Sequence, residues 1–322
     1  MIPKFSSAVA AVVVLACSLI PLTASGQTND PAAARTLNGH IFIPSSLIKD
    51  PFITTLVRTQ TGGGFATKVA RDVESEVVDS LIDALVGDLA FMALEFEYQH
   101  AVTDWLALSA SASGAARIGT GAQSVLAQGV TSMFGFKLRA AARIHQSERW
   151  LFSGVVRAQP STQYRLDVLT FAKRVIEERQ IAEDNSLVLK SKGIGAAAGI
   201  RGAYAPKNWL GFVFGGEVGY ADTFDSEGRD DLASEFGLLA SFDLNPLRGI
   251  PLGLLASGKY DSFVVDNSDI TEKVTTFGWG LAYTGRDDFS LSLETSHIRV
   301  PLIQSDRTIG ATLVAFNLKY FF

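Results

Sequence analysis

The sequence predicts an all-β protein: one closed, antiparallel, up-and-down transmembrane β-barrel of about twelve strands. Three observations predict this fold. Apolar residues recur at every second position, short and long connections alternate, and the last segment is apolar on one face as far as Phe322. Apolar residues make up 47% of the chain, yet after Leu22 no apolar run reaches the roughly 20 residues of a membrane-spanning helix. Without helices, only a closed barrel satisfies all backbone polar groups inside a bilayer.

Alternating segments run from about Leu89 to the end of the chain. In one clear example, the apolar residues Leu210, Phe212 and Phe214 stand at every second position. Because residues two apart lie on the same face of a strand, each segment has one apolar face. The segments are 91–100, 105–117, 130–145, 150–160, 188–204, 209–221, 232–244, 251–263, 273–284, 289–299 and 308–322.

These eleven segments leave the barrel one strand short, because single-chain barrels of this type have an even number of strands. We expect the missing strand at Phe52 to Gly62, which is rich in β-branched residues and is followed by Gly63 and Gly64. This strand would start the barrel and pair with the last one. Twelve strands is therefore the prediction, with ten and fourteen as the alternatives.

The connections between the segments alternate in length. The short ones are 101–104, 146–149, 205–208, 245–250 and 284–288, and the long ones are 118–129, 161–187, 222–231, 264–272 and 300–307. Short turns on one side of the membrane and long external loops on the other are typical of transmembrane barrels. We also expect short helices in external loops, at Asp72 to Val86 and at Leu169 to Ile181.

Aromatic residues directly follow four of the five short turns. They are Trp105, Trp150, Trp209 and Phe289. Aromatic rings favour the level of the lipid headgroups, so rings at the same depth on successive hairpins predict a girdle at one membrane surface. The alternative is that these rings are ordinary hydrophobic anchors of the turns.

The N-terminal segment has the three parts of a secretory signal: the cation Lys4, an apolar run from Ala8 to Leu22, and small residues before Gly26. We expect cleavage after Gly26, so that residues 1–26 are a signal peptide. Residues 27–50 are expected to form a periplasmic N-terminal segment, and residues 51–322 the barrel. A lipoprotein signal with Cys17 as the lipidated residue is the alternative.

The end of the chain is apolar at every second position, at Phe316, Leu318, Tyr320 and Phe322. This pattern resembles the assembly signal of Gram-negative outer-membrane proteins. Together with the signal peptide and the hairpin rhythm, it indicates that superclass but no particular family. The resemblance implies a place in the bacterial outer membrane. It also implies contact with membrane lipid, lipopolysaccharide and the outer-membrane assembly machinery.

The strand face opposite the apolar one carries charged residues, which a water-filled lumen accepts and a packed core does not. We expect the following residues to line a pore: Glu95, Glu97, Lys137, Arg139, Arg143, Arg157, Arg201, Glu217, Glu235, Lys259, Asp261 and Glu294. Basic residues gather on the third to fifth segments and acidic residues on the sixth and seventh, an arrangement that resembles a porin constriction. The alternative is a set of salt bridges that closes a narrow, non-conducting barrel.

Composition excludes several classes of function. Cleavage after Gly26 removes the single cysteine, which leaves neither a thiol nucleophile nor a cysteine-ligated zinc site. The remaining 27 basic residues against 33 acidic residues give a net charge of −6, which argues against nucleic acid as a partner. The acidic loops 222–231 and 264–272 lack the spacing of an EF-hand, so we expect no specific metal site and no cofactor.

The leading function is a narrow, passive channel for small polar solutes. The runner-up is a non-conducting barrel that binds a partner or lipopolysaccharide through its external loops. A lipid-modifying enzyme ranks third: a serine–histidine pair of His297 with Ser296 or Ser290 is conceivable at the external rim, but these serines alternate to the other strand face. The histidines are His40, His100, His145 and His297.

Overall fold

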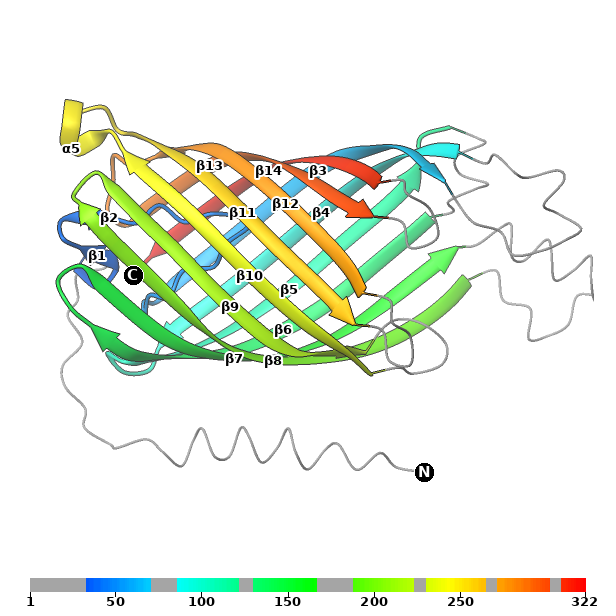
Figure 1. Cartoon of the computed structure of the whole chain (residues 1–322), viewed down its shortest axis with the longest axis horizontal. Coiled ribbons are helices and arrows are strands. Elements are labelled where there is room, and N and C mark those ends of the chain that lie inside the picture. Colours follow the sequence, from blue (N-terminus) through cyan, green and yellow to red (C-terminus); the bar gives the residue numbers. More distant parts are fainter. Residues whose placement is uncertain are drawn as a thin grey trace, which may run out of the picture.

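A computed structural model describes residues 33–70, 86–121, 130–166, 188–222, 230–264, 271–301 and 308–322. Twelve antiparallel strands, β3 to β14, form a closed barrel in which each strand pairs with its neighbours in the chain and β14 pairs with β3 (Figure 1). The strands are β3 (Leu56–Ala70), β4 (Val86–Ala101), β5 (Leu106–Gly119), β6 (Val130–Gln146), β7 (Trp150–Leu166), β8 (Val188–Lys207), β9 (Leu210–Asp222), β10 (Asp230–Asp243), β11 (Leu252–Val264), β12 (Thr271–Tyr283), β13 (Phe289–Pro301) and β14 (Thr308–Phe321). The predicted fold and strand number are confirmed.

The first and last strands close the barrel. Their register runs from Ala66 opposite Ala311 to Leu56 opposite Phe321. The first strand therefore pairs with the last, as expected, but it begins at Leu56 rather than at Phe52. Residues 52–55 belong to a segment inside the barrel; residues 52–54 are buried, and Gln99 donates hydrogen bonds to the carbonyl groups of Phe52 and Thr54. Local β-propensity favours a strand at these residues, but their contacts inside the lumen keep them out of the sheet.

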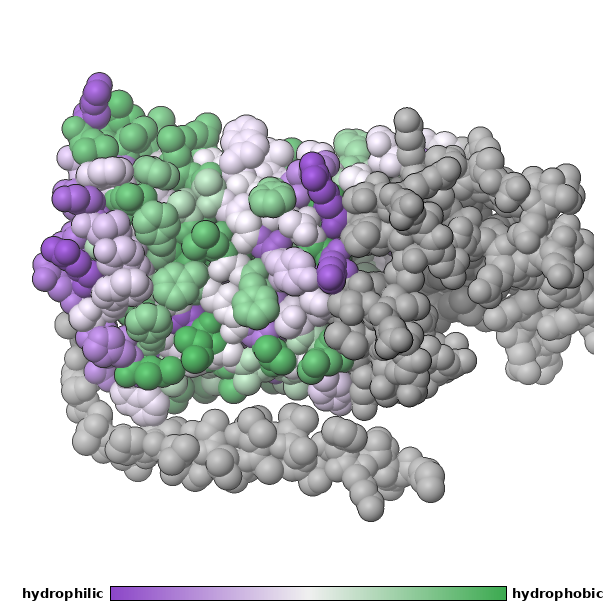
Figure 2. All heavy atoms as spheres, in the orientation of Figure 1, coloured by the Kyte–Doolittle hydropathy of each residue, from purple (hydrophilic) through white to green (hydrophobic). Residues whose placement is uncertain are grey.

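The outer and inner faces of the barrel differ as the alternation predicts. On the outer face, Phe136, Phe236 and Trp279 are exposed, and Figure 2 shows hydrophobic residues over the surface that faces the viewer. The inner face carries the charged side chains. A soluble protein does not present so large an apolar surface to water, so the barrel spans a membrane. Among the described residues, no helix has the length and apolar character needed to cross a bilayer.

We call the two ends of the barrel the turn end and the loop end. The turn end carries the short turns, the C-terminus and the short helix α5 (Asn245–Arg248), all at the left of Figure 1. Aromatic pairs lie at this end, among them Trp150 stacked on Tyr204 with ring centroids 4.0 Å apart. The helix expected over residues 169–181 lies outside the described residues, as does the helix expected over 72–86 except for Val86, which begins β4.

The chain enters the barrel at the turn end. Residues 33–35 form a turn of 3-10 helix, and strands β1 (Thr36–Leu37) and β2 (His40–Ile41) pair as a small hairpin. The hairpin turns at Asn38 and Gly39, which both have positive φ angles, as a tight two-residue turn requires. The chain then continues from residue 42 to 55 before β3 begins. We refer to residues 36–55 as the plug segment.

Candidate functional site: the lumen and its plug segment

The plug segment lies inside the turn-end half of the lumen. The prediction of a periplasmic N-terminal segment over residues 27–50 did not include this position. Two residues hold it at the mouth. Asn38 donates side-chain hydrogen bonds to the carbonyl groups of Ala205 and Pro206. Arg35, just before the segment, lies 4.1 Å above the ring of Phe321. The chain therefore enters the barrel beside its own C-terminus.

Apolar side chains of the plug segment pack against the β7–β12 side of the lumen. Phe42, Ile43, Ile48 and Phe52 are buried in one cluster with inward-facing barrel residues. Those barrel residues are Leu151, Ala203, Ala205, Val213, Leu239, Leu255 and Ala282. They stand on the strand face that carries charges elsewhere in the barrel. Their apolar character is explained by the segment that covers them.

Three inward-facing glycines make room for the plug segment. A Cβ atom at Gly211 would collide with the ring of His40, one at Gly237 with Ile48, and one at Gly253 with Ile43. The glycines lie on three consecutive strands, β9, β10 and β11. The barrel wall is thus hollowed where the segment lies against it. We call these three residues the glycine cradle.

His40 makes polar contacts within this packed region. Its Nε2 lies 2.9 Å from Ser241 Oγ, and its Nδ1 lies 3.3 Å from the carbonyl oxygen of Asn208. Burial lowers the pKa of His40 to about 4, although the backbone contact with Asn208 opposes the shift. The imidazole is therefore neutral at pH 7. The pair resembles a serine–histidine dyad only in its chemistry, because both side chains are fully buried.

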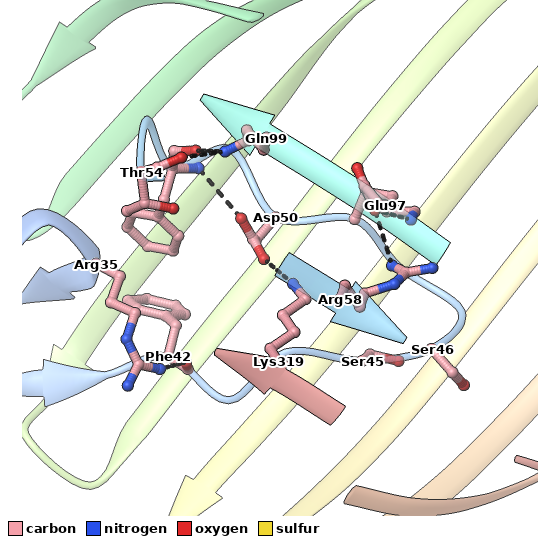
Figure 3. Close-up of polar contacts among 12 residues, drawn as sticks. Arg35, Phe42, Ser45, Ser46, Asp50, Thr54, Arg58, Glu97, Gln99 and Lys319 are labelled. Atoms are coloured by element: carbon pink, nitrogen blue, oxygen red, sulfur yellow. Dashed lines mark hydrogen bonds and ion pairs between the residues drawn. The ribbon is translucent and has the colours of Figure 1, made fainter. Parts of the chain in front are cut away.

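Ion pairs fasten the plug segment to the opposite side of the lumen, on β3 and β4. Lys49 Nζ lies 3.0 Å from Glu95 and 2.7 Å from Glu97. Arg58 of β3 is fully buried beside them, 3.1 Å from Glu95 and 3.6 Å from Glu97. Arg139 of β6 reaches Glu97 at 2.5 Å. Figure 3 shows Arg58 and Glu97 facing each other from neighbouring strands.

The middle of the plug segment is bound to the last strand. Lys319 of β14 donates a hydrogen bond of 2.8 Å to Asp50, and Figure 3 shows the two side chains pointing toward each other. Burial raises the pKa of Asp50, but the attraction and hydrogen bond of Lys319 together with the attraction of Arg139 outweigh it and hold this pKa below its usual value. Asp50 is therefore ionised at neutral pH. The contact joins the plug segment to the strand that closes the barrel.

Glu294 of β13 binds the turn of the plug segment at Ser45 and Ser46. Its carboxylate accepts a hydrogen bond of 2.8 Å from each serine hydroxyl and bonds of 2.8 and 2.9 Å from the backbone N–H of Ser46. Ser292 donates one more, at 2.8 Å. These donors satisfy a buried carboxylate without a cation. Glu294 is thus an anchor for the plug segment.

A second group of charges lies on β7 to β11. Arg157 Nε is 2.7 Å from Glu217, and Arg157 Nη2 is 3.4 Å from Glu235. Lys259 lies 3.4 Å from Glu235 and 3.1 Å from Asp261. These residues line a cavity of about 320 Å³ that extends along β7 to β11. A further cavity of about 150 Å³, lined by Glu95 and Gln60, shares Gln159 and Ser161 with it.

The residues predicted to line a pore occupy the inner face, but they are not two opposed walls of free charge. Most are paired, as in the contacts above. Arg143 lies at the turn-end rim, where it pairs with Asp104 at 3.2 Å. Lys137, on the inner face of β6, has no ion-pair partner among the residues that the structure describes. Whether these residues line a conducting pore stays a prediction.

Sequence analysis missed the polar residues of the plug segment, namely Lys49, Asp50, Ser45 and Ser46. One signal could have revealed them: Leu151, Val213, Leu239 and Leu255 interrupt the polar face of their strands near the turn end. Such residues require an apolar partner inside the lumen. The apolar run around Phe42 and Ile43 was the available partner.

In the part of the chain that the structure describes, histidines and possible metal ligands indicate no second site. His297 is exposed on the outer face, with Nδ1 3.4 Å from the hydroxyl of Thr312. Within the described ranges, no group of three or more histidine, aspartate and glutamate side chains could hold a metal ion. The acidic loop residues 223–229 and 265–270 lie outside those ranges. The lumen with its plug segment is therefore the candidate functional site.

Comparison with known proteins supports this fold. An outer membrane channel from Pseudomonas putida F1 is similar with a TM-score of 0.55 at 12% identity, over 87% of this chain and 100% of that chain. The β domain of the Bordetella autotransporter BrkA is similar with a TM-score of 0.50 at 12% identity, over 84% of this chain and 100% of that domain. The chain has the fold of a bacterial outer-membrane β-barrel. No family model matches the sequence, and no curated protein matches it.

Proposed function

We propose that this protein is a channel for small polar solutes in the bacterial outer membrane, and that its plug segment closes it at the turn end. The observation that carries the proposal is the division of the lumen. The loop-end half holds cavities lined by charged side chains, whereas the turn-end half is filled by a separate segment. The structural likeness to an outer membrane channel supports the same function.

The residues around the plug segment suit a segment that can leave. The inward-facing barrel residues against it are small at Ala203, Ala205 and the glycine cradle, so its departure would open space that the wall itself does not fill. Small filled barrels instead occupy their interior with their own side chains. The wall also keeps its own ion pairs without the segment. Glu97, for example, would lose Lys49 but keep Arg139 and Arg58.

The test is to displace the plug segment from the cradle without touching its ion pairs. Replacing both Gly211 and Gly237 with Leu would fill the space that His40 and Ile48 occupy. Leucine is a better strand residue than glycine, so the barrel itself should still form. In planar bilayers, the double variant should show stable open channels, and the wild type should show a conductance at least tenfold lower on average.

A matched control is Gly258→Leu. A Cβ atom at Gly258 would meet only the ring of Phe277 on the outer face, at 3.9 Å. This variant should behave like the wild type. If the cradle variant inserts correctly but its conductance is as low as that of the control, the channel proposal fails. The runner-up then leads: a permanently closed barrel that binds a partner or lipopolysaccharide through its external loops.

A further inference from the structure

The larger cavity of the lumen is hollow because small residues line one side of it. Gly195, Ala197, Gly219 and Ala233 of β8, β9 and β10 are part of its wall. Charged side chains form the rest, from Arg157 on β7 to Lys259 and Asp261 on β11. Its volume of about 320 Å³ is at the lower end of the range of about 300 to 1,000 Å³ for small-molecule pockets. It therefore suits a small solute.

The charges in and beside this cavity are balanced. In its lining, Arg157 and Lys259 face the carboxylates of Glu217, Glu235 and Asp261. The buried Arg201 lies beside the lining and pairs with Glu217, which brings the group to three charges of each sign. A solute with a net charge would meet like charges beside the opposite ones. A solute that carries both signs can satisfy both kinds of group at once. We use the name balanced cluster for six residues: Arg157, Arg201, Glu217, Glu235, Lys259 and Asp261.

Two of the contacts in the balanced cluster are weak enough to be exchanged. Glu235 lies 3.4 Å from both Arg157 and Lys259, whereas a strong charged hydrogen bond is about 2.7 to 2.9 Å long. The Glu235 side chain is 30% exposed and that of Arg157 is 25% exposed, so both remain accessible to the cavity. A bound carboxylate and a bound ammonium group can therefore replace long contacts with short ones.

An unsatisfied donor lies next to the cavity. The Nη1 atom of Arg201 is buried and has no hydrogen-bond partner in the described part of the chain, although the Nη2 atom is bonded to Glu217. A small space of about 20 Å³ brings Arg201 and Glu217 together with Ile48 and Lys49 of the plug segment. A buried guanidinium with a free donor favours an acceptor from water or from a ligand. Glu217 and Glu235 line both spaces, so they connect the larger cavity to Ile48 and Lys49 of the plug segment.

We propose that this cavity, with the balanced cluster in and beside its wall, binds a small zwitterionic solute, with one ammonium and one carboxylate group as in a free α-amino acid. The carboxylate of the solute pairs with Arg157 and Lys259. The ammonium group pairs with Glu235 and Asp261. As the solute of the channel, this ligand rests on the proposed function, but its binding needs no open pore.

Equilibrium binding to the refolded, detergent-solubilised protein tests the proposal, with calorimetry as the readout. The probes are L-glutamine as the zwitterion, its N-acetyl derivative as the anion, its methyl ester as the cation, and glycerol as a neutral polyol. Glutamine should bind saturably. Each blocked derivative should bind at least about tenfold more weakly, because it loses one charge-assisted contact and meets like charge.

Variants place the site within the barrel. Glu235→Gln removes a carboxylate that the ammonium group needs and should weaken glutamine binding about tenfold. Asp288→Asn is the matched control, because Asp288 also forms an ion pair, with Arg286, but at the turn end outside the lumen. It should bind glutamine like the wild type. The migration of unheated samples in electrophoresis verifies that each variant has folded.

Three outcomes would overturn the proposal: no saturable binding of glutamine, equal binding of glutamine and its blocked derivatives, or binding that Glu235→Gln leaves unchanged. Preference for glycerol would assign the cavity to polyols instead. These results are separate from the channel test. Glutamine binding without conductance in the cradle variant would overturn only the channel proposal. Conductance without glutamine binding would overturn only the proposal of a zwitterion site.

Discussion

The two halves of the lumen are built from the same strands, yet one half is packed and the other is hollow. On β10, Leu239 is buried against the plug segment, whereas Ala233 and Glu235, a few residues farther along the same face, line the hollow cavity. The turn-end half resembles the core of a soluble protein, with apolar packing and buried ion pairs. The loop-end half resembles a binding site. The polarity and size of an inward-facing residue therefore depend on what occupies the lumen at its depth.

The largest effect is expected where the lumen is packed. Leu239→Asn replaces a buried apolar side chain with an amide. This amide would lie in the apolar cluster with Phe and Ile side chains, which offer no hydrogen bonds. This change should lower the free energy of unfolding by about 3 to 5 kcal/mol. Guanidinium titrations in lipid vesicles measure it. A loss below about 1 kcal/mol would mean that the plug segment does not pack against β10.

Acid should release the plug segment through His40. The folded-state pKa of about 4 lies below the ordinary value of 6.5, so the stabilisation is complete above pH 6.5 and is lost as the pH falls toward 4. The difference between these two pKa values corresponds to about 3 kcal/mol at the acid limit. Protease accessibility of the plug segment at pH 7 and pH 4.5 is the measurement.

Two variants make this pH test specific. His40→Gln should keep a polar contact to Ser241 but remove the dependence of plug release on pH in this range. His297→Gln changes an exposed histidine on the outer face and should leave the dependence as in the wild type. If acid releases the segment equally in all three proteins, carboxylates rather than His40 control it.

A smaller effect is expected at the anchor Glu294. Glu294→Gln keeps the shape of the side chain but replaces a carboxylate that accepts several hydrogen bonds from Ser45 and Ser46. Hydrogen bonds to a charged group contribute about 1.5 to 3 kcal/mol, so the seated plug segment should lose about that much. Hydrogen exchange at the Ser46 amide should speed up accordingly. Unchanged exchange would remove Glu294 from the anchoring contacts.

The smallest effect is expected in the hollow half. Ala233→Asn adds an amide to the wall of the cavity, where open space and polar neighbours accept it. It should change the free energy of unfolding by less than about 0.5 kcal/mol. The same titration as for Leu239→Asn measures it on the same strand. Similar losses at both positions would abolish the distinction between the two halves.

The strands and their two faces follow from local patterns in the sequence. Alternation is a local property, because a strand repeats every two residues, so apolar Phe236 and charged Glu235 point to opposite sides wherever the strand lies. The rhythm of turns and the even strand number then led to twelve strands. The inward position of the charged residues followed from the same parity.

The contents of the lumen and the pairing of its charges depend on the tertiary structure. Lys49 and Glu97 are 48 residues apart, and Asp50 and Lys319 are 269 apart, so no local period relates them. The plug segment has no repeating pattern of its own, because each of its residues contacts a different part of the barrel wall. Ile43 packs against Gly253, and Lys49 forms ion pairs with β4. Pairing of this kind depends on the closure of the barrel, which brings distant strands around one short segment.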